Sequence, residues 1–307
     1  MASRGMARSA GCARFRLRPM SFLPLQAPTA LGYFATLVAE DEGFALLEAA
    51  IAVAQDEYPG LDPQGVLSDI DRLAVRLRRR IPADAAAMHR LRALNRFFFG
   101  ELGFAGNVND YYDSRNSYLN EVLRTRRGIP ITLALLYCEL ASQAGLSARG
   151  VSFPGHFLVK LRMPRGEVVI DPMDGRSLSR EDLEQRLTPY RHRHGLIGDF
   201  DTPLGLFLQS SPARDTLARL LRNLKEIHRS VEDWPRLMAV QQRLVLVLPA
   251  SGDELRDRGL VWARLGRRDE AVLDLERYLS HHPDADDANA MRLRLGELRR
   301  SDAPRWH

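Results

Sequence analysis

The sequence predicts an α+β protein in which helices flank a small antiparallel sheet and an all-helical part follows. Three observations carry this prediction. Apolar residues recur at three- and four-residue spacing over much of the first 100 residues. Short β-rich runs lie between residues 147 and 171, and a 34-residue repeat appears after residue 212. Together these patterns indicate an α+β domain followed by stacked helical hairpins.

The composition is that of a soluble globular chain, and its net charge is local. Hydrophobic residues make up 45% and charged residues 27% of the 307, with a formal net charge of +5. Five arginines within residues 1–18 supply this excess, and from residue 19 onward 39 basic residues face 39 acidic ones. A basic nucleic-acid-binding surface is therefore not expected.

Residues 1–19 form an arginine-rich stretch without acids, which we expect to be a disordered tail, either a targeting segment or an extension before Met20. It lacks the apolar run of a secretory signal. No window approaches the about 20 apolar residues that cross a bilayer. The two cysteines, Cys12 and Cys138, give no disulfide framework. We therefore expect a cytoplasmic protein without membrane contacts.

Residues 41–58, 62–80 and 84–99 carry helical patterns. Asp62 followed by Pro63 is typical of a helix start, because the aspartate can cap and proline needs no donor at the first position. One apolar face then follows, formed by Leu67, Ile70, Leu73, Ala74 and Leu77. This face predicts a core-packed helix.

A polar connection rich in Asn, Asp, Tyr and Arg runs from Gly103 to Gly128. Connections of this length are uncommon in compact domains unless they are functional or packed by their own side chains. Ser117 is a candidate cap for a short helix through Leu123. A recognition loop and a purely structural loop both remain open.

A helix from Pro130 to about Ala144, ended by Gly145, is expected to feed a small antiparallel sheet. The β-rich runs cover 147–153, 156–162 and 167–171, and a turn at 163–166 joins the last two. Ser179 and Asp182 then predict a capping box that begins another helix.

His156 opens one predicted strand and Asp171 closes the next, so the hairpin brings them near each other. The cross-strand partner of His156 falls at or within two residues of Asp171, and opposite Cβ atoms lie about 4.5–5.5 Å apart. An imidazole oriented by a carboxylate is the base half of a catalytic triad. The same pair also fits a plain structural hydrogen bond.

The C-terminal part carries a repeat with an offset of 34 residues, which aligns 220–249 with 254–283. It resembles the tetratricopeptide repeat, with the second copy the clearer one. The last helix, at 287–300, is expected to cap the pair. We predict domains at 20–211 and 212–307. Repeats of this kind present a groove to protein or peptide partners, although the pair could also simply brace the core.

The segments from Arg127 to Gly145, around His156 and ending at Asp171 are similar to the transglutaminase-like (papain-like) core. Over about residues 30 to 285 the chain resembles the bacterial SirB family, which joins that core to tetratricopeptide repeats. The resemblance implies a catalytic histidine at His156 and an aspartate at Asp171. It also implies a cysteine near the start of the preceding helix.

The nucleophile departs from this pattern, because counting back about fifteen residues from Gly145 reaches Pro130. Cys138 lies eight residues further on, about 12 Å along the helix and about 80° around it, and its apolar neighbours predict a small buried hydrophobe. Thr132, in the first turn, is the remaining candidate. A threonine hydroxyl needs strong activation, and hydrogen bonding around the helix start is its expected role.

No pattern indicates a cofactor or a metal, since His192, His194, His281 and His282 lack partners at ligand spacing. The leading hypothesis is a non-enzymatic interaction or regulatory module on a transglutaminase-like fold. The alternative is an acyl transferase or amide hydrolase that uses His156 and Asp171, with Thr132 or water as nucleophile. A nucleic-acid-binding role is disfavoured by the charge balance.

Overall fold

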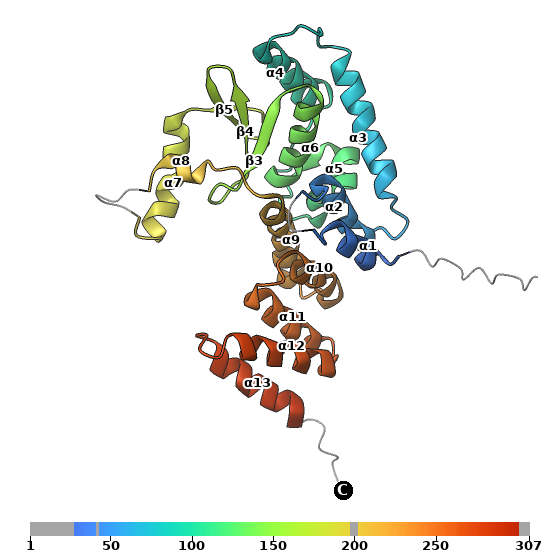
Figure 1. The fold of residues 1–307 in the computed structure, drawn as a ribbon, viewed down its shortest axis with the longest axis vertical. Coiled ribbons are helices and arrows are strands. Elements are labelled where there is room, and N and C mark those ends of the chain that lie inside the picture. Colours follow the sequence, from blue (N-terminus) through green and yellow to red (C-terminus); the bar gives the residue numbers. More distant parts are fainter. Residues whose placement is uncertain (1–27, 41–42, 197–201, 301–307) are drawn as a thin grey trace, which may run out of the picture.

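The computed structural model describes residues 28–40, 43–196 and 202–300. Figure 1 shows an elongated molecule in which a body of helices and strands continues into a stack of helices toward the C-terminus. The expected tail at 1–19 lies outside the described residues. Among the helices within these ranges, none combines the length and apolar character needed to cross a bilayer.

Four helices form the N-terminal part: α1 (Ala30–Leu37), α2 (Leu46–Ala52), α3 (Pro63–Arg78) and α4 (Ala87–Asn95). The predicted start of α3 is confirmed, because the Asp62 carboxylate accepts from the Gln64 N–H at 3.0 Å. Of the predicted apolar face, Leu67 is half-buried and the rest is buried, namely Ile70, Leu73, Ala74 and Leu77. The α3 helix therefore packs as its pattern predicts.

The polar connection is ordered and contains β1 (Ala105–Gly106), a 3₁₀ turn (Ser114–Ser117), α5 (Leu119–Thr125) and β2 (Arg127–Gly128). β1 and β2 pair in parallel. The short helix is present, but its expected cap is wrong. Ser117 ends the 3₁₀ turn that Asp113 caps, and Tyr118 holds the cap position of α5. The Ser117 hydroxyl has no hydrogen-bond partner among the described residues.

Helix α6 covers Pro130–Gln143 and ends with a cap at Ala144, and Gly145 follows with φ 75° as the predicted terminating glycine. A four-stranded antiparallel sheet follows in the order β3-β4-β5-β6. Its strands are β3 (Ser147–Val151), β4 (Leu158–Met163), β5 (Gly166–Ile170) and β6 (Ser177–Leu178). The predicted turn at 163–166 is confirmed by the pairing of Met163 with Gly166.

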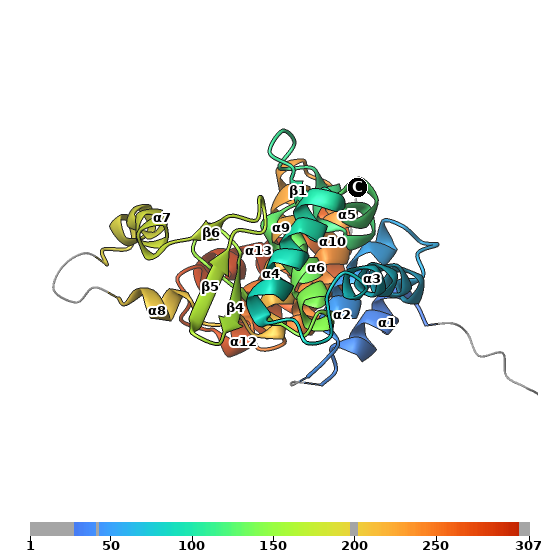
Figure 2. The ribbon, with the colours of Figure 1, turned by 90° about the horizontal axis from the view of Figure 1, so that it is seen from above.

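The sheet separates two apolar layers, because alternate side chains of a strand point to opposite faces. Val159 and Leu161 belong to the main core with α6. Leu158 belongs to a second cluster with α7 (Arg180–Arg193) and α8 (Leu204–Phe207), which Figure 2 shows on the far side of the sheet. Helix α7 begins at the predicted capping box of Ser179 and Asp182.

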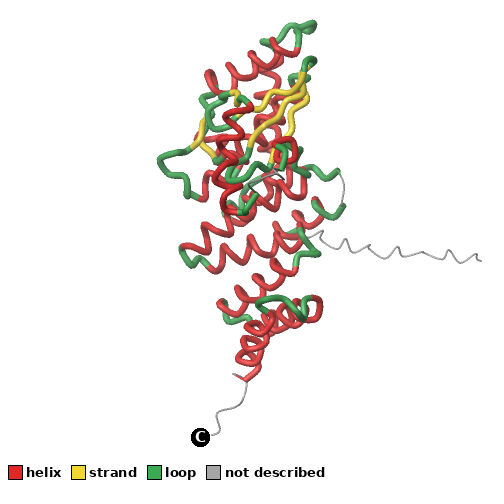
Figure 3. Tube along the Cα trace, turned by 90° about the vertical axis from the view of Figure 1, so that its left-hand side faces the viewer, coloured by secondary structure: helices red, strands yellow, loops and turns green. Residues whose placement is uncertain are grey.

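Five helices complete the described part of the chain: α9 (Ala213–Ser230), α10 (Trp234–Val247), α11 (Gly252–Arg264), α12 (Arg268–His281) and α13 (Ala288–Arg300). Figure 3 shows them stacked below the sheet. The starts of α10 and α12, at Trp234 and Arg268, reproduce the predicted offset. Gly259 keeps α11 close to α12, since a Cβ there would lie 3.1 Å from Leu275.

The first hairpin of this stack belongs to the main core. Leu220 and Leu224 of α9 and Leu244 of α10 share one buried cluster with residues of α2 and α6. The boundary predicted between 211 and 212 coincides with the segment before α9. Within the described residues, however, the core runs across this boundary without interruption, so the division into 20–211 and 212–307 stays a prediction.

Candidate functional site

The β4–β5 hairpin places His156 and Asp171 side by side. His156 precedes β4 in a tight turn where its N–H donates to the Phe153 carbonyl at 3.0 Å, and Asp171 directly follows β5. The ladder pairs Val159 with Ile170, so its continuation sets His156 within two residues of Asp171. His156 Nε2 lies 2.9 Å from Asp171 Oδ1. The contact expected from the hairpin is thus present.

Asp171 is a buried carboxylate with three hydrogen-bond donors. Besides His156, the Met173 N–H donates to Oδ1 at 3.0 Å and Arg186 Nη1 donates to Oδ2 at 2.8 Å. Burial raises the pKa of the Asp171 carboxyl, but these donors outweigh it, led by His156, and hold the pKa at about 2. The site therefore keeps a fixed negative charge behind the imidazole.

This depressed pKa predicts a specific acid sensitivity. An unfolded aspartate titrates near pKa ~3.9, so the stabilisation by ionised Asp171 is present above about pH 4 and is lost as pH falls toward 2. After allowance for solvent screening, we expect about 1–2 kcal/mol from this group. Urea unfolding from pH 5 to 2 should show this extra loss in the wild type and not in Asp171→Asn. Parallel pH profiles for the two proteins would contradict the assignment.

Arg219 of α9 holds the turn that carries His156. Its guanidinium donates to the His156 carbonyl at 2.7 Å, to the Phe153 carbonyl at 3.1 Å and to Ser152 Oγ at 2.6 Å. It also lies 5.6 Å from the centroid of the Phe157 ring. Helix α9 thereby contributes directly to the position of the histidine. Sequence reasoning missed Arg219 and Arg186, since neither stands in a recognisable local pattern.

The start of α6 offers no exposed nucleophile. Pro130 occupies the first helical position and is buried. Thr132 is fully buried, and its hydroxyl oxygen lies 2.8 Å from the Asn116 carbonyl and 3.0 Å from the Ile129 carbonyl while it accepts from the Ile129 N–H. Its hydroxyl therefore ties the helix start to the preceding loop, the role expected for a threonine in the first turn.

Asn116 organises the loop above this helix start. Its side chain, in a residue only 3% exposed, donates to the Asp110 carbonyl at 2.7 Å and accepts from Asn107 Nδ2 at 3.0 Å. Tyr111 and Tyr112 remain exposed beside a cavity of about 280 Å³ that faces α9. The loop is thus packed by its own polar groups and also presents two aromatic rings to solvent.

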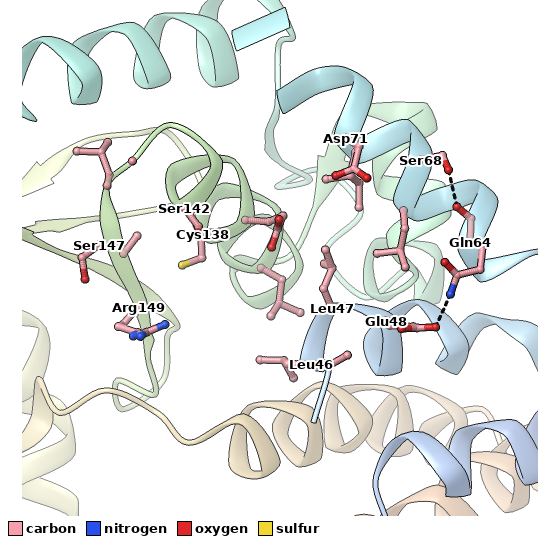
Figure 4. Close-up of a pocket in the computed structure, with 18 residues that line it drawn as sticks. Leu46, Leu47, Glu48, Gln64, Ser68, Asp71, Cys138, Ser142, Ser147 and Arg149 are labelled. Atoms are coloured by element: carbon pink, nitrogen blue, oxygen red, sulfur yellow. Dashed lines mark hydrogen bonds between the residues drawn. The ribbon is translucent and has the colours of Figure 1, made fainter. Parts of the chain in front are cut away.

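Cys138 lies apart from the histidine pair. It lines an open cavity of about 830 Å³ between α2, α3, α6 and β3, and His156 and Asp171 are not among its lining residues. Figure 4 shows Cys138 near Ser142 and Arg149 on one side of this cavity, with Glu48 across from it. Burial raises the pKa of the Cys138 thiol to about 12. Its thiolate is therefore strongly disfavoured at neutral pH.

The remaining histidines that the sequence singled out are exposed, namely His192, His194, His281 and His282. Across the described ranges, no group of three or more His, Cys, Asp or Glu side chains is arranged to hold a metal ion. The candidate functional features are therefore the His156–Asp171 pair and the C-terminal stack of helices.

The helix–sheet core with a paired histidine and aspartate, followed by helical hairpins, defines a transglutaminase-like domain joined to tetratricopeptide repeats. Residues 64–222 match the family model of the transglutaminase-like superfamily, and residues 224–296 match a tetratricopeptide-repeat model. The two domain types expected from the SirB resemblance are thereby confirmed.

The chain belongs to the UPF0162 family of bacterial proteins. It is 38% identical to a UPF0162 protein of Xylella fastidiosa over 260 residues, which cover 84% of this chain and 92% of the relative. Identity to a UPF0162 protein of Pseudomonas aeruginosa is 30% over 254 residues, 83% of this chain and 91% of the relative. For UPF0162 protein YchA of Escherichia coli it is 24% over 257 residues, 82% and 92% of the two chains. No solved structure matches the chain.

Proposed function

We propose that this protein is a non-enzymatic interaction or regulatory module, built on a transglutaminase-like domain without a catalytic thiol. The carrying observation is Pro130, which stands where the resemblance requires a cysteine. Proline supplies neither a nucleophile nor a backbone donor. The partner is a protein or peptide bound through the repeats, and the Cys138 thiol suits a reducing, cytoplasmic location.

The two other candidate nucleophiles support this proposal. The Thr132 hydroxyl is fully buried and hydrogen-bonded to backbone groups, so activation would require breaking the start of α6. The Cys138 thiol is held protonated by burial and lines a different cavity. A thiolate stabilised at a helix start is the feature that such catalysis needs, and neither residue provides it.

A second candidate function rests on the intact acid–base frame. Arg186 and the Met173 N–H fix Asp171, and Asp171 in turn fixes the His156 imidazole through Nε2. A histidine held in this way can act as general base toward water. The alternative is thus an acyl transferase or amide hydrolase whose attacking group is a bound water or Thr132.

Turnover decides between the two functions. We expect the purified full chain to hydrolyse or transamidate a panel of glutamine, amide and thioester substrates no faster than its His156→Ala variant, as followed by mass spectrometry. His194→Ala, which removes an exposed histidine, is the matched control. A turnover present in the wild type and in the control but abolished by His156→Ala would establish the enzyme instead.

A further inference from the structure

A cavity of about 370 Å³ lies where α9, α10, α11 and α13 meet. Its apolar wall consists of Trp234 and Leu237 of α10 with Leu260 and Val261 of α11. Leu237 and Val261 are buried, whereas Trp234 and Leu260 are partly accessible. The accessible indole and leucine side chains offer a place for one bulky apolar group of a ligand.

Basic side chains surround this apolar wall. Lys225, Arg229, Arg264 and Arg294 line the cavity, and its only acidic lining residue is Asp257. Four cations from three helices therefore face one carboxylate within this part of the described chain. What matters for a ligand is how many of these charges are already neutralised.

The charges of Asp257 and Lys225 are neutralised by each other and by adjacent ionised side chains. Lys225 Nζ lies 2.6 Å from both Asp257 Oδ2 and Glu254 Oε2, and Arg256 donates to Asp257 Oδ1 at 2.8 Å. Lys225 is also buried. These groups form a closed network inside the stack and leave the arginines to face a ligand.

The three arginines remain open to a ligand, since within the described chain one is unpaired and two are paired only at the surface. Arg264 is exposed and has no carboxylate partner among the described residues, and its guanidinium lies 5.4 Å from the Trp234 ring centroid. Arg229 and Arg294 pair only with acids three residues away on their own helices. Such partly exposed pairs contribute little, so a ligand carboxylate can replace them at low cost.

We propose that this cavity binds an acidic peptide segment of a partner protein, with an apolar side chain on Trp234 and carboxylates against Arg229, Arg264 and Arg294. The inference rests on the proposed function and adds the chemistry of the partner. The arginines come from three different helices that meet at the cavity. A peptide with several acidic residues around one apolar side chain can pair its carboxylates with the arginines and pack the apolar group against Trp234.

The test uses the full chain and a defined probe. The probe is a fluorescein-labelled, C-terminally amidated 12-residue peptide of Glu and Asp with one central Leu. The comparison peptide replaces each acid by Lys. We expect saturable binding of the acidic probe by fluorescence polarisation, weakening as salt rises, and at least about tenfold weaker binding of the lysine peptide. Equal binding of both peptides, or none up to millimolar protein, would overturn the proposal.

Point variants place the probe in the cavity. Arg264→Glu and Arg294→Glu should each weaken the acidic probe about tenfold, because each sets a like charge against the ligand. Arg72→Glu makes the same charge change at an exposed position of α3 that does not line the cavity, and should leave binding unchanged. The probe should alter tryptophan emission in the wild type and not in Trp234→Phe. Unfolding curves establish that each variant is folded.

The outcomes separate this inference from the proposed function. If the lysine peptide binds and its binding strengthens in Arg264→Glu, the repeats still bind a partner at this cavity, and only its acidic character is wrong. If a single-stranded oligonucleotide displaces the acidic probe at equal concentration, the cavity binds phosphate groups, and the proposal of a peptide ligand is wrong. If no peptide binds and the His156-dependent turnover above is found, both proposals fail.

Discussion

Asp56→Ala is expected to lower the free energy of unfolding by about 3 kcal/mol. Asp56 is the carboxylate partner of Arg243, a residue of α10 that is only 1% exposed. Without Asp56, Arg243 keeps a hydrogen bond to the Ala239 carbonyl and a contact with the Phe34 ring. A buried guanidinium left without a counter-charge is strongly destabilising. Urea denaturation of the variant measures the loss.

The neighbouring residue supplies the control. Glu57 pairs with Arg236 at the surface, where the two side chains are 28% and 53% exposed, and Arg236 also contacts Asp233. Glu57→Ala should therefore cost at most about 1 kcal/mol. Adding Arg243→Met to Asp56→Ala should recover most of the stability, because an apolar side chain needs no counter-charge. If Asp56→Ala costs no more than Glu57→Ala, Arg243 tolerates its burial unpaired. If adding Arg243→Met recovers nothing, the unpaired charge is not the cause of the loss.

Gly175→Ala is expected to destabilise the protein by about 2–4 kcal/mol. Gly175 lies in the turn after Asp171, has φ 79°, and donates its N–H to the Asp171 carbonyl at 2.9 Å. A Cβ there would lie 2.5 Å from a ring carbon of Phe99. Backbone strain and the clash act together. The His156 ring resonances should also shift in NMR spectra, since the turn holds Asp171.

Gly266→Ala isolates the backbone contribution. Gly266 has φ 73°, close to that of Gly175, but a Cβ there would meet nothing within 4 Å. Its substitution should cost about 1 kcal/mol, the strain of a left-handed alanine alone. The difference between the two variants measures the contact with Phe99. A Gly175→Ala protein no less stable than Gly266→Ala would mean that Phe99 moves aside freely.

Local patterns were enough to predict most elements and the central pair of the site. The Asp62–Pro63 start, the capping box at Ser179 and the glycine end of α6 depend on residues within a few positions of each other. The contact between His156 and Asp171 follows from a two-residue hairpin turn, which fixes the register over the whole hairpin. Each of these predictions depends on residues that lie close together along the chain.

Two of the residues that sequence reasoning missed act over long separations. Arg219 reaches His156 across 63 residues and Arg243 reaches Asp56 across 187. An arginine on a helix surface looks the same in sequence whether it is solvated or braces a distant turn. Cys138, predicted as a buried hydrophobe, is half-buried: its side chain packs against the main core and also borders an open cavity that no local pattern indicates.

Because the α9–α10 hairpin is part of the main core, the number of helical repeats cannot change freely in this architecture. Helices α9 and α10 complete the wall against which α2 and α6 pack, so their loss would expose the interior of the first domain. The junction between the first hairpin and α11 relies instead on a smaller cluster around Leu237, Met238 and Val261, together with the polar network of Lys225 and Glu254. Repeats can therefore be gained or lost only beyond Val247, and an exchange of the whole array between proteins would have to carry part of the first domain with it.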